Sequence, residues 1–190
     1  MNNAAVLEPM TMEQFLALPD DGVDRDLIRG KLLESPISYR GKRHTRTTSQ
    51  LDFLLRRWLL TLPMPRGDVL VGDQAFRFRH NPDSIIGTDI AVISPELAAL
   101  LPEDAFIIEG VPLLAVEILP PSDIRERIAD KILEYLSANV PFVWIVDPVF
   151  RTVTVYRPDA KPAMFNEDHE LLGDPHLPGL RISVAEIFHT

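Results

Sequence analysis

The chain reads Leu113-Leu-Ala-Val-Glu-Ile-Leu119, then Pro120-Pro-Ser-Asp123, then a stretch of helical periodicity to about Asn139, then Phe142-Val-Trp-Ile-Val-Asp147. The two outer runs are short, apolar and rich in Val and Ile, as is typical of buried strands. This stretch therefore predicts a strand, a helix and a second strand in succession. The first strand is expected to end near one carboxylate, Glu117.

The predicted helix carries a single cation on the face that should be buried. At 100° per residue, Ile128, Ile132 and Tyr135 form an apolar stripe, and Lys131 falls within it. A lysine in such a stripe is uncommon unless an anion pairs with it, and Glu117 is the nearest candidate. Alternatively, the lysine stem lies along apolar surface while its ammonium group reaches water. The other charged residues of the helix are expected to face solvent: Arg125, Glu126, Asp130 and Glu134.

Length and composition predict one compact domain over residues 1–190, with 46% hydrophobic and 25% charged residues. The absence of cysteine excludes disulfides, thiol nucleophiles and zinc–thiolate sites. The first 20 residues lack the pattern of a signal peptide, and no apolar run is long enough to span a membrane. We therefore expect a cytoplasmic protein without a membrane partner.

The charge of the chain is unevenly distributed. The formal net charge is −9, but residues 40–57 contain six basic residues and one acidic residue. A local basic patch on an acidic body suits an enzyme that contacts a polyanion at one place. It equally suits a domain with one solvated helix face.

The remaining periodicity predicts a helix over 11–18 capped by Thr11, a β-hairpin around Arg29-Gly30, and an amphipathic helix over 45–62. One or two strands are expected at 69–78 and single strands at 89–93, 152–156 and 179–183. A small helix or turn is expected at 95–101, a connecting loop or short strand at 104–110, and a short helix at 184–188. The predicted fold is α/β, a mixed β-sheet flanked by helices with an N-terminal β-hairpin.

Two acids stand at the ends of neighbouring predicted strands. Asp89 opens one strand, and Glu117 comes late in the next. If these strands are antiparallel, both carboxylates lie at the same edge of the sheet, where Lys131 could also reach. Mg²⁺ takes oxygen ligands, commonly one or two carboxylates completed by water and substrate phosphate. Two acids and a lysine are the groups needed for metal-assisted phosphodiester hydrolysis.

Several motifs resemble the Uma2 family of bacterial proteins regarded as restriction-like endonucleases. The matching segments are Thr88-Asp89, Val116-Glu-Ile-Leu-Pro-Pro-Ser122, Lys131-Ile-Leu-Glu-Tyr135, Asn139-Val-Pro-Phe-Val-Trp-Ile-Val-Asp-Pro148 and Val153-Thr-Val-Tyr156. The family usually has proline at position 88. In the usual nuclease motif the lysine follows the acid by two residues, a position that Leu119 occupies here. The family is thought to use a lysine on the following helix, which is Lys131.

The resemblance implies a single restriction-endonuclease-like domain that hydrolyses phosphodiester bonds in DNA with Mg²⁺ or Mn²⁺. Its catalytic residues are then Asp89, Glu117 and Lys131, with Asp89 and Glu117 as metal ligands. Cleavage of a duplex would make a homodimer plausible. The alternative is a non-catalytic nucleic-acid-binding or regulatory protein on the same fold.

Two further residues are candidates for accessory roles. Asp26 matches an acid that is common in the family and is either an extra ligand or a turn-capping residue. His44 either contacts a substrate phosphate or lies on the surface near a helix start, which is the more common arrangement. The candidate DNA contacts are four basic residues before and at this helix: Arg40, Lys42, Arg43 and Arg46.

Overall fold

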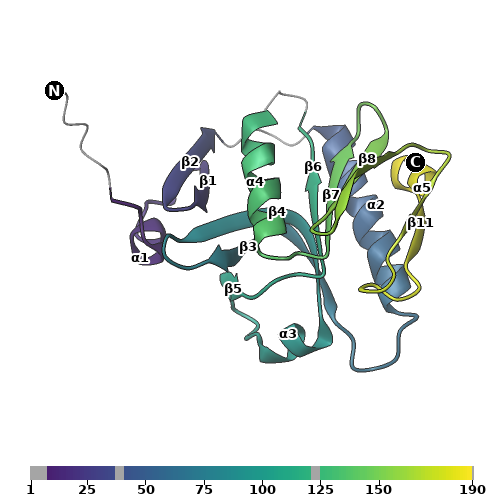
Figure 1. The fold of residues 1–190 in the computed structure, drawn as a ribbon, viewed down its shortest axis with the longest axis horizontal. Helices are drawn as coiled ribbons and strands as arrows, with labels where there is room; N and C mark the ends of the chain where they lie inside the picture. The colour runs from purple at the N-terminus through teal and green to yellow at the C-terminus, as the bar shows by residue number, and fades with distance from the viewer. Residues whose placement is uncertain (1–7, 37–40, 121–124, 190) are drawn as a thin grey trace.

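The computed structural model describes residues 8–36, 41–120 and 125–189 (Figure 1). The helices are α1 (Met12–Leu16), α2 (Lys42–Leu59), α3 (Pro95–Leu100), α4 (Arg125–Ser137) and α5 (Val184–Phe188). The strands are β1 (Val23–Ile28), β2 (Lys31–Pro36), β3 (Asp68–Arg79), β4 (Ser84–Ile93), β5 (Ile107–Glu109), β6 (Leu114–Ile118), β7 (Phe142–Asp147), β8 (Thr152–Arg157), β9 (Ala160–Phe165), β10 (Glu170–Leu172) and β11 (Arg181–Ser183). Among these helices, none is long and apolar enough to cross a membrane.

A mixed sheet of nine strands organises the part of the chain that the structure describes. Its main path is β2-β1-β4-β6-β7-β8-β9, while β3 pairs with β4 and with β5. Strands β6 and β7 are parallel, and α4 connects them. Parallel neighbours cannot be joined by a tight turn, so this pair requires the crossover that α4 provides. The mixed sheet with an N-terminal hairpin confirms the predicted α/β fold class.

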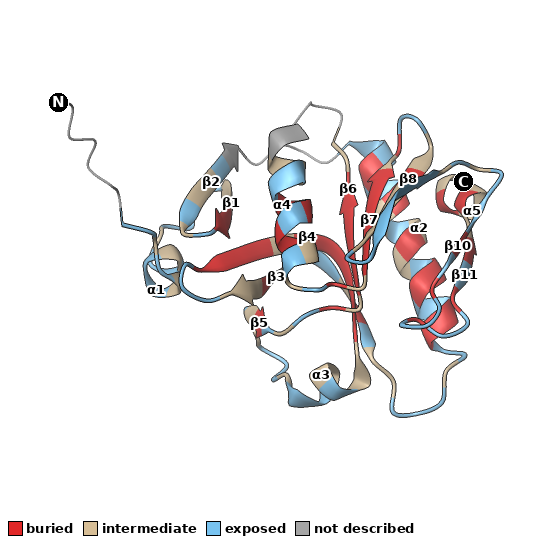
Figure 2. Ribbon diagram, viewed as in Figure 1, coloured by how far each residue is buried: buried red, intermediate tan, exposed pale blue. Residues whose placement is uncertain are grey.

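Helices α2 and α4 cover opposite faces of the sheet (Figures 1 and 2). Strand β6 is buried on both faces, and its side chains alternate between them. Val116 packs into the core that contains the α2 leucines, whereas Ala115 packs with Ile132 and Tyr135 of α4. The alternation therefore places Glu117, two residues after Ala115, on the α4 face.

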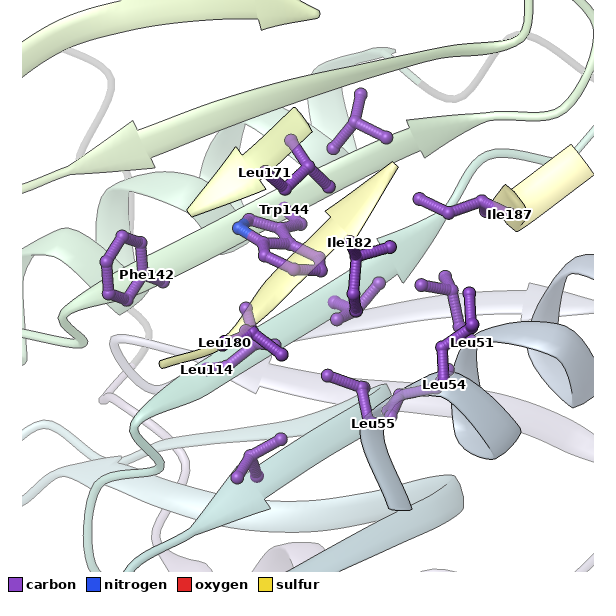
Figure 3. Packing of buried hydrophobic residues seen from close by; sticks show 14 of the residues in the cluster. Leu51, Leu54, Leu55, Leu114, Phe142, Trp144, Leu171, Leu180, Ile182 and Ile187 are labelled. Carbon is purple, nitrogen blue, oxygen red and sulfur yellow. The ribbon is translucent and has the colours of Figure 1, made fainter. Parts of the chain in front are cut away.

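The larger core lies between α2, the centre of the sheet and the C-terminal β10–β11–α5 unit. Trp144 of β7 is fully buried in it, and Figure 3 shows it among leucine and isoleucine side chains from these elements. The same core contains residues that are far apart in the chain, such as Leu54 and Ile182. This packing secures the position of α2 against the sheet.

The predicted hairpin and the shortest helices are confirmed. Arg29 and Gly30 have φ of 51° and 72°, the pair of positive values that a two-residue type I′ turn requires. A Cβ on Gly30 would also lie 2.3 Å from the Cβ of Pro9.

The side chain of Thr11 accepts a hydrogen bond from the backbone N–H of Gln14, which caps α1 as predicted.

Some helix and strand assignments differ from the sequence prediction. Helix α2 begins at Lys42 rather than at 45, and it ends at Leu59 because the backbone N–H groups of Thr61 and Leu62 donate to carbonyls only three residues back. Strand β4 begins at Ser84, so Asp89 lies inside it and not at its start. Strand β9 was not predicted, because it is an exposed edge strand with little alternation of apolar residues.

The expectation that Glu134 faces solvent is wrong. Glu134 is only 1% exposed. Its carboxylate accepts hydrogen bonds from Ser84 (2.8 Å), Arg79 (3.1 Å) and Arg29. Burial alone would raise the pKa of Glu134, but these three donors outweigh it and hold the pKa below its usual value. The hairpin turn, β3 and β4 are thereby joined to α4.

Replacing Glu134 by glutamine should lower the free energy of unfolding near neutral pH by about 1–3 kcal/mol, because charge-assisted hydrogen bonds are lost. The folded pKa lies below the unfolded value of 4.5, so this stabilisation is present above that pH and disappears as pH falls through the folded pKa. Urea unfolding at several pH values should show the two proteins converging in acid. Asp130→Asn, at an exposed position of α4, serves as the control and should change little; a gap that persists undiminished in acid would contradict the assignment.

Candidate active site

The centre of the candidate site is a buried ion pair between α4 and β6. The Nζ atom of Lys131 lies 3.1 Å and 3.3 Å from the two carboxylate oxygens of Glu117. The two residues are only 7% and 4% exposed. Nζ also donates to the backbone carbonyl of Gly87 at 2.7 Å. The predicted pairing is thus confirmed, and the alternative of a lysine that reaches water is wrong.

Asp89 lies beside this pair because it is the first residue of β4 beyond the segment that pairs with β6. The two strands are antiparallel, and their last paired residues at this edge are Ile90 and Val116. One residue beyond, the Asp89 carboxylate accepts a hydrogen bond of 2.7 Å from the backbone N–H of Ile118. This side-chain hydrogen bond therefore takes the place of the next backbone hydrogen bond between β4 and β6. The antiparallel arrangement brings both acids to one edge, as the sequence predicts.

His44 is buried, which corrects the expectation of a surface histidine. It is 6% exposed, and its Nε2 atom lies 3.6 Å from an Asp89 carboxylate oxygen. This distance permits electrostatic attraction but exceeds a hydrogen bond, and Nε2 has no hydrogen-bond partner among the described residues. The reason for burial is the earlier start of α2, which puts His44, Thr47 and Leu51 on its buried face.

Asp26 joins the same cluster from β1. It is 1% exposed, accepts from the backbone N–H of Gly87 at 3.1 Å and lies 3.6 Å from Nζ of Lys131. Two nitrogens of Arg127 donate to its other oxygen at 2.9 and 2.7 Å. The turn-capping interpretation of Asp26 is therefore wrong, because the side chain ties β1 to β4 and α4.

Tyr135 contributes a contact that the sequence interpretation did not include. Its hydroxyl group donates a hydrogen bond to Glu117 and lies 3.2 Å from the hydroxyl oxygen of Thr88. The tyrosine was assigned to the core, which its full burial bears out. Its position four residues after Lys131 on the same stripe was a signal that both side chains reach one place.

Burial and charge set the protonation of the cluster. Burial raises the pKa of Glu117 to about 7, against the attraction of Lys131. Burial would lower the pKa of Lys131, but Glu117 and Asp26 outweigh it and raise that pKa. Burial opposes the charge on Asp89, yet His44 and the Ile118 N–H hold its pKa below the usual value. Burial and the charge of Glu117 raise the pKa of Tyr135, so its hydroxyl stays protonated.

The basic segment divides into two parts in the structure. Lys42, Arg43 and Arg46 are exposed on the first turns of α2, whereas Arg40 lies outside the described residues. At the far end of the same helix, Arg56 pairs with Asp52 and Asp68, and Arg57 pairs with Glu186. Among the described basic residues of this segment, only the three at the start of α2 therefore remain as candidate nucleic-acid contacts.

Two carboxylates of the cluster are ligands of the kind that a magnesium site uses. Among the described residues, no group of three or more His, Cys, Asp or Glu side chains is arranged to hold a metal ion. Asp89 and Glu117 nevertheless supply two carboxylates at one edge, the number that Mg²⁺ uses when waters and substrate phosphate complete its shell. The residues thus fit a cation that is shared with a substrate.

Lys131→Met should lower the free energy of unfolding of the metal-free protein by about 3 kcal/mol, because it leaves buried acceptors without their donor. Adding Glu117→Gln to this variant should cost less than Glu117→Gln costs alone, with a coupling energy of about 2 kcal/mol. Urea unfolding of the four proteins in the cycle measures this term. Lys42→Met, at an exposed position, is the control; additive losses would show that the pair is not coupled.

Comparisons with known proteins agree with this architecture. A crystal structure of "a putative nuclease belonging to DUF820" from Anabaena variabilis ATCC 29413 is similar over 95% of this chain and 98% of that chain, with a TM-score of 0.79 and 23% identity. At that identity the likeness establishes the fold. No protein with a curated functional description matches the chain. The model of the Uma2 family, described as "putative restriction endonuclease", matches residues 12–185, so the chain belongs to the Uma2 family.

Proposed function

We propose that this protein is a metal-dependent endonuclease that hydrolyses phosphodiester bonds in DNA, with Asp89, Glu117 and Lys131 as its catalytic residues. The observation that carries the proposal is the buried pair of Lys131 and Glu117 beside Asp89 at one sheet edge. Buried charges cost stability, and such an arrangement is common where chemistry needs it. Membership of the Uma2 family supports a nuclease of this kind.

Asp89 and Glu117 would hold Mg²⁺ or Mn²⁺, which when bound polarises a phosphate and lowers the pKa of water. The raised pKa of Lys131 keeps its amine protonated, so it serves as a fixed cation and not as a base. At this position Lys131 orients the attacking water or offsets the negative charge that develops on the phosphate. The Gly87 carbonyl and Glu117 hold the ammonium group in place.

The exposed cations of α2, Lys42, Arg43 and Arg46, would contact backbone phosphates without reading sequence. Cleavage of both strands of a duplex would require two such centres, which a two-fold homodimer supplies. On this proposal the protein is a single restriction-endonuclease-like domain that acts in the cytoplasm.

One observation favours a second candidate function. Both oxygens of Glu117 are already engaged by Lys131, and one of them also accepts from Tyr135. A site whose charges satisfy one another can serve folding alone, in which case the protein binds or regulates nucleic acid without cleaving it. Cleavage assays decide between the two functions.

Purified protein should nick or degrade plasmid DNA in the presence of Mn²⁺ or Mg²⁺. Glu117→Gln and Lys131→Met should each lower the rate by at least about 100-fold, because each removes a charge that acts on the reacting phosphate. The assay is run well below the melting temperature of each variant, with Asp130→Asn as a fully active control. Failure of the wild type to cleave duplex DNA, single-stranded DNA or RNA with either metal would favour the binding protein.

Mg²⁺ or Mn²⁺ should raise the melting temperature of the wild type, because a ligand that binds the native state stabilises it by mass action. Asp89→Asn should remove this increase, since it replaces a charged oxygen ligand by an amide. Differential scanning calorimetry with and without EDTA measures the effect. An equal increase in both proteins would move the metal site away from Asp89.

A further inference from the structure

Two cations of α4, Arg127 and Lys131, approach the same oxygen atom of Asp26. They are four residues apart and so lie on one face of the helix. Arg127 donates to Oδ2 of Asp26 from Nε at 2.9 Å and from Nη2 at 2.7 Å. Nζ of Lys131 lies 3.6 Å from this oxygen, beyond the range of a hydrogen bond. Arg127 therefore makes the hydrogen bonds to Oδ2 that Lys131 is near enough to take over.

Arg127 occupies a place that its own helix disfavours for a cation. It lies in the first turn of α4, near the positive end of the helix dipole. Two acids of β1, Asp24 and Asp26, offset this cost. They are two residues apart and so project from one face of the strand, and Nη2 of Arg127 donates to both, at 3.2 Å and 2.7 Å. The two anions hold the guanidinium group over Oδ2 of Asp26, where its side chain is only 13% exposed.

The position of Lys131 depends on which acids compete for its ammonium group. Its contacts with the two oxygens of Glu117, at 3.1 Å and 3.3 Å, are longer than the 2.7 Å contact with the Gly87 carbonyl. Asp26 is 1% exposed, so water could not replace the donors of Arg127 if they were removed. The flexible stem of Lys131 would then let Nζ move toward Asp26, at the expense of its longer contacts with Glu117.

We infer that Arg127 is a positioning residue for the proposed reaction: it satisfies Asp26 and so keeps Lys131 in its catalytic position. That position is the one in contact with Glu117 and the Gly87 carbonyl. The inference rests on the proposed function for the role of Lys131 in cleavage. Arg127 acts on the reaction through Asp26 and Lys131, and its guanidinium group meets the demand of a buried carboxylate that would otherwise draw on the catalytic cation.

Arg127→Met removes the donors and leaves the charge of Asp26. In plasmid cleavage with saturating Mn²⁺ at about pH 8, above the raised Glu117 pKa of about 7, kcat should fall about 10- to 100-fold, because small misplacements of a catalytic group have effects of this size. KM for DNA should stay within about twofold of the wild type, since the change acts on the reacting step. Adding Asp26→Asn should restore most of kcat, because a neutral amide no longer attracts Lys131.

This rescue separates positioning from a structural role. The double variant still lacks the ion pair between β1 and α4, so it should recover activity while its melting temperature stays below that of the wild type. Arg29→Met is the matched control, because Arg29 also joins the β1–β2 hairpin to α4, but through Glu134. It should lower the melting temperature and leave kcat unchanged.

NMR of the protein without metal or DNA follows the position of Lys131 directly. The side-chain Nζ and Cε signals of Lys131 should shift in Arg127→Met, return toward the wild-type positions when Asp26→Asn is added, and stay in place in Arg29→Met. If Arg127→Met does not fold, Arg127→Lys takes its place in both experiments. It keeps the positive charge but loses the two-pronged donor geometry, so it should shift the same signals and lower kcat by a smaller factor.

Lys131 signals that do not move in Arg127→Met, an unchanged kcat, or a loss of kcat that Asp26→Asn fails to restore would each overturn the inference. The NMR measurement needs no turnover, so it stands apart from the proposed function. A wild type that never cleaves, with Lys131 signals that move and return as described, would keep the control of Lys131 by Arg127 and reject the catalytic proposal. A wild type that cleaves, with Arg127→Met equal to it in kcat and in Lys131 signals, would do the reverse.

Discussion

The contact between Lys131 and Glu117 is the constraint on which the site depends. A buried ammonium group is tolerated only with good partners, and here a carboxylate and the Gly87 carbonyl supply them. These partners belong to β6 and β4, so the lysine fixes α4 against both strands. A shift of one residue along α4 would turn Lys131 by about 100° and move its ammonium group away from Glu117, which would leave that buried carboxylate without its cation. The parallel β6–α4–β7 unit therefore has one permitted register.

The site also depends on β4, which contacts helices on both faces of the sheet. Thr88 reaches Tyr135 of α4, while the next residue, Asp89, reaches His44 of α2. Consecutive residues of a strand point to opposite faces, so two neighbouring side chains can join the two helix layers. The larger core then secures α2 at the position that this contact needs. Packing far from the cluster thereby determines where the start of α2 lies relative to Asp89.

Local periodicity was sufficient for the central part of the site and insufficient for its surroundings. The stripe on α4 identified Lys131 because a cation among apolar residues violates the pattern of its own helix. The same stripe placed Glu134 on the solvent side of α4, which is wrong. Its partners Arg29 and Arg79 are 105 and 55 residues away in the chain, so the pattern of α4 alone could not reveal them. His44 was assigned to the surface because α2 was expected to begin after it. Its spacing from Leu51, seven residues on, matched the buried face and was the available signal.

The charges of the cluster suggest why a cation and the start of α2 would act together. Asp26, Asp89 and Glu117 are three buried carboxylates, and Lys131 and Arg127 are the cations that contact them. Above the raised Glu117 pKa of about 7, where all three groups are ionised, the carboxylates outnumber these two cations, and the excess negative charge repels a phosphate as long as no metal is bound. A divalent cation would make the net charge of the cluster positive. The exposed cations of α2 attract the nucleic-acid backbone whether or not the metal is bound. On the proposed function, α2 therefore supplies affinity for the nucleic acid, and the metal admits the phosphate to the carboxylates.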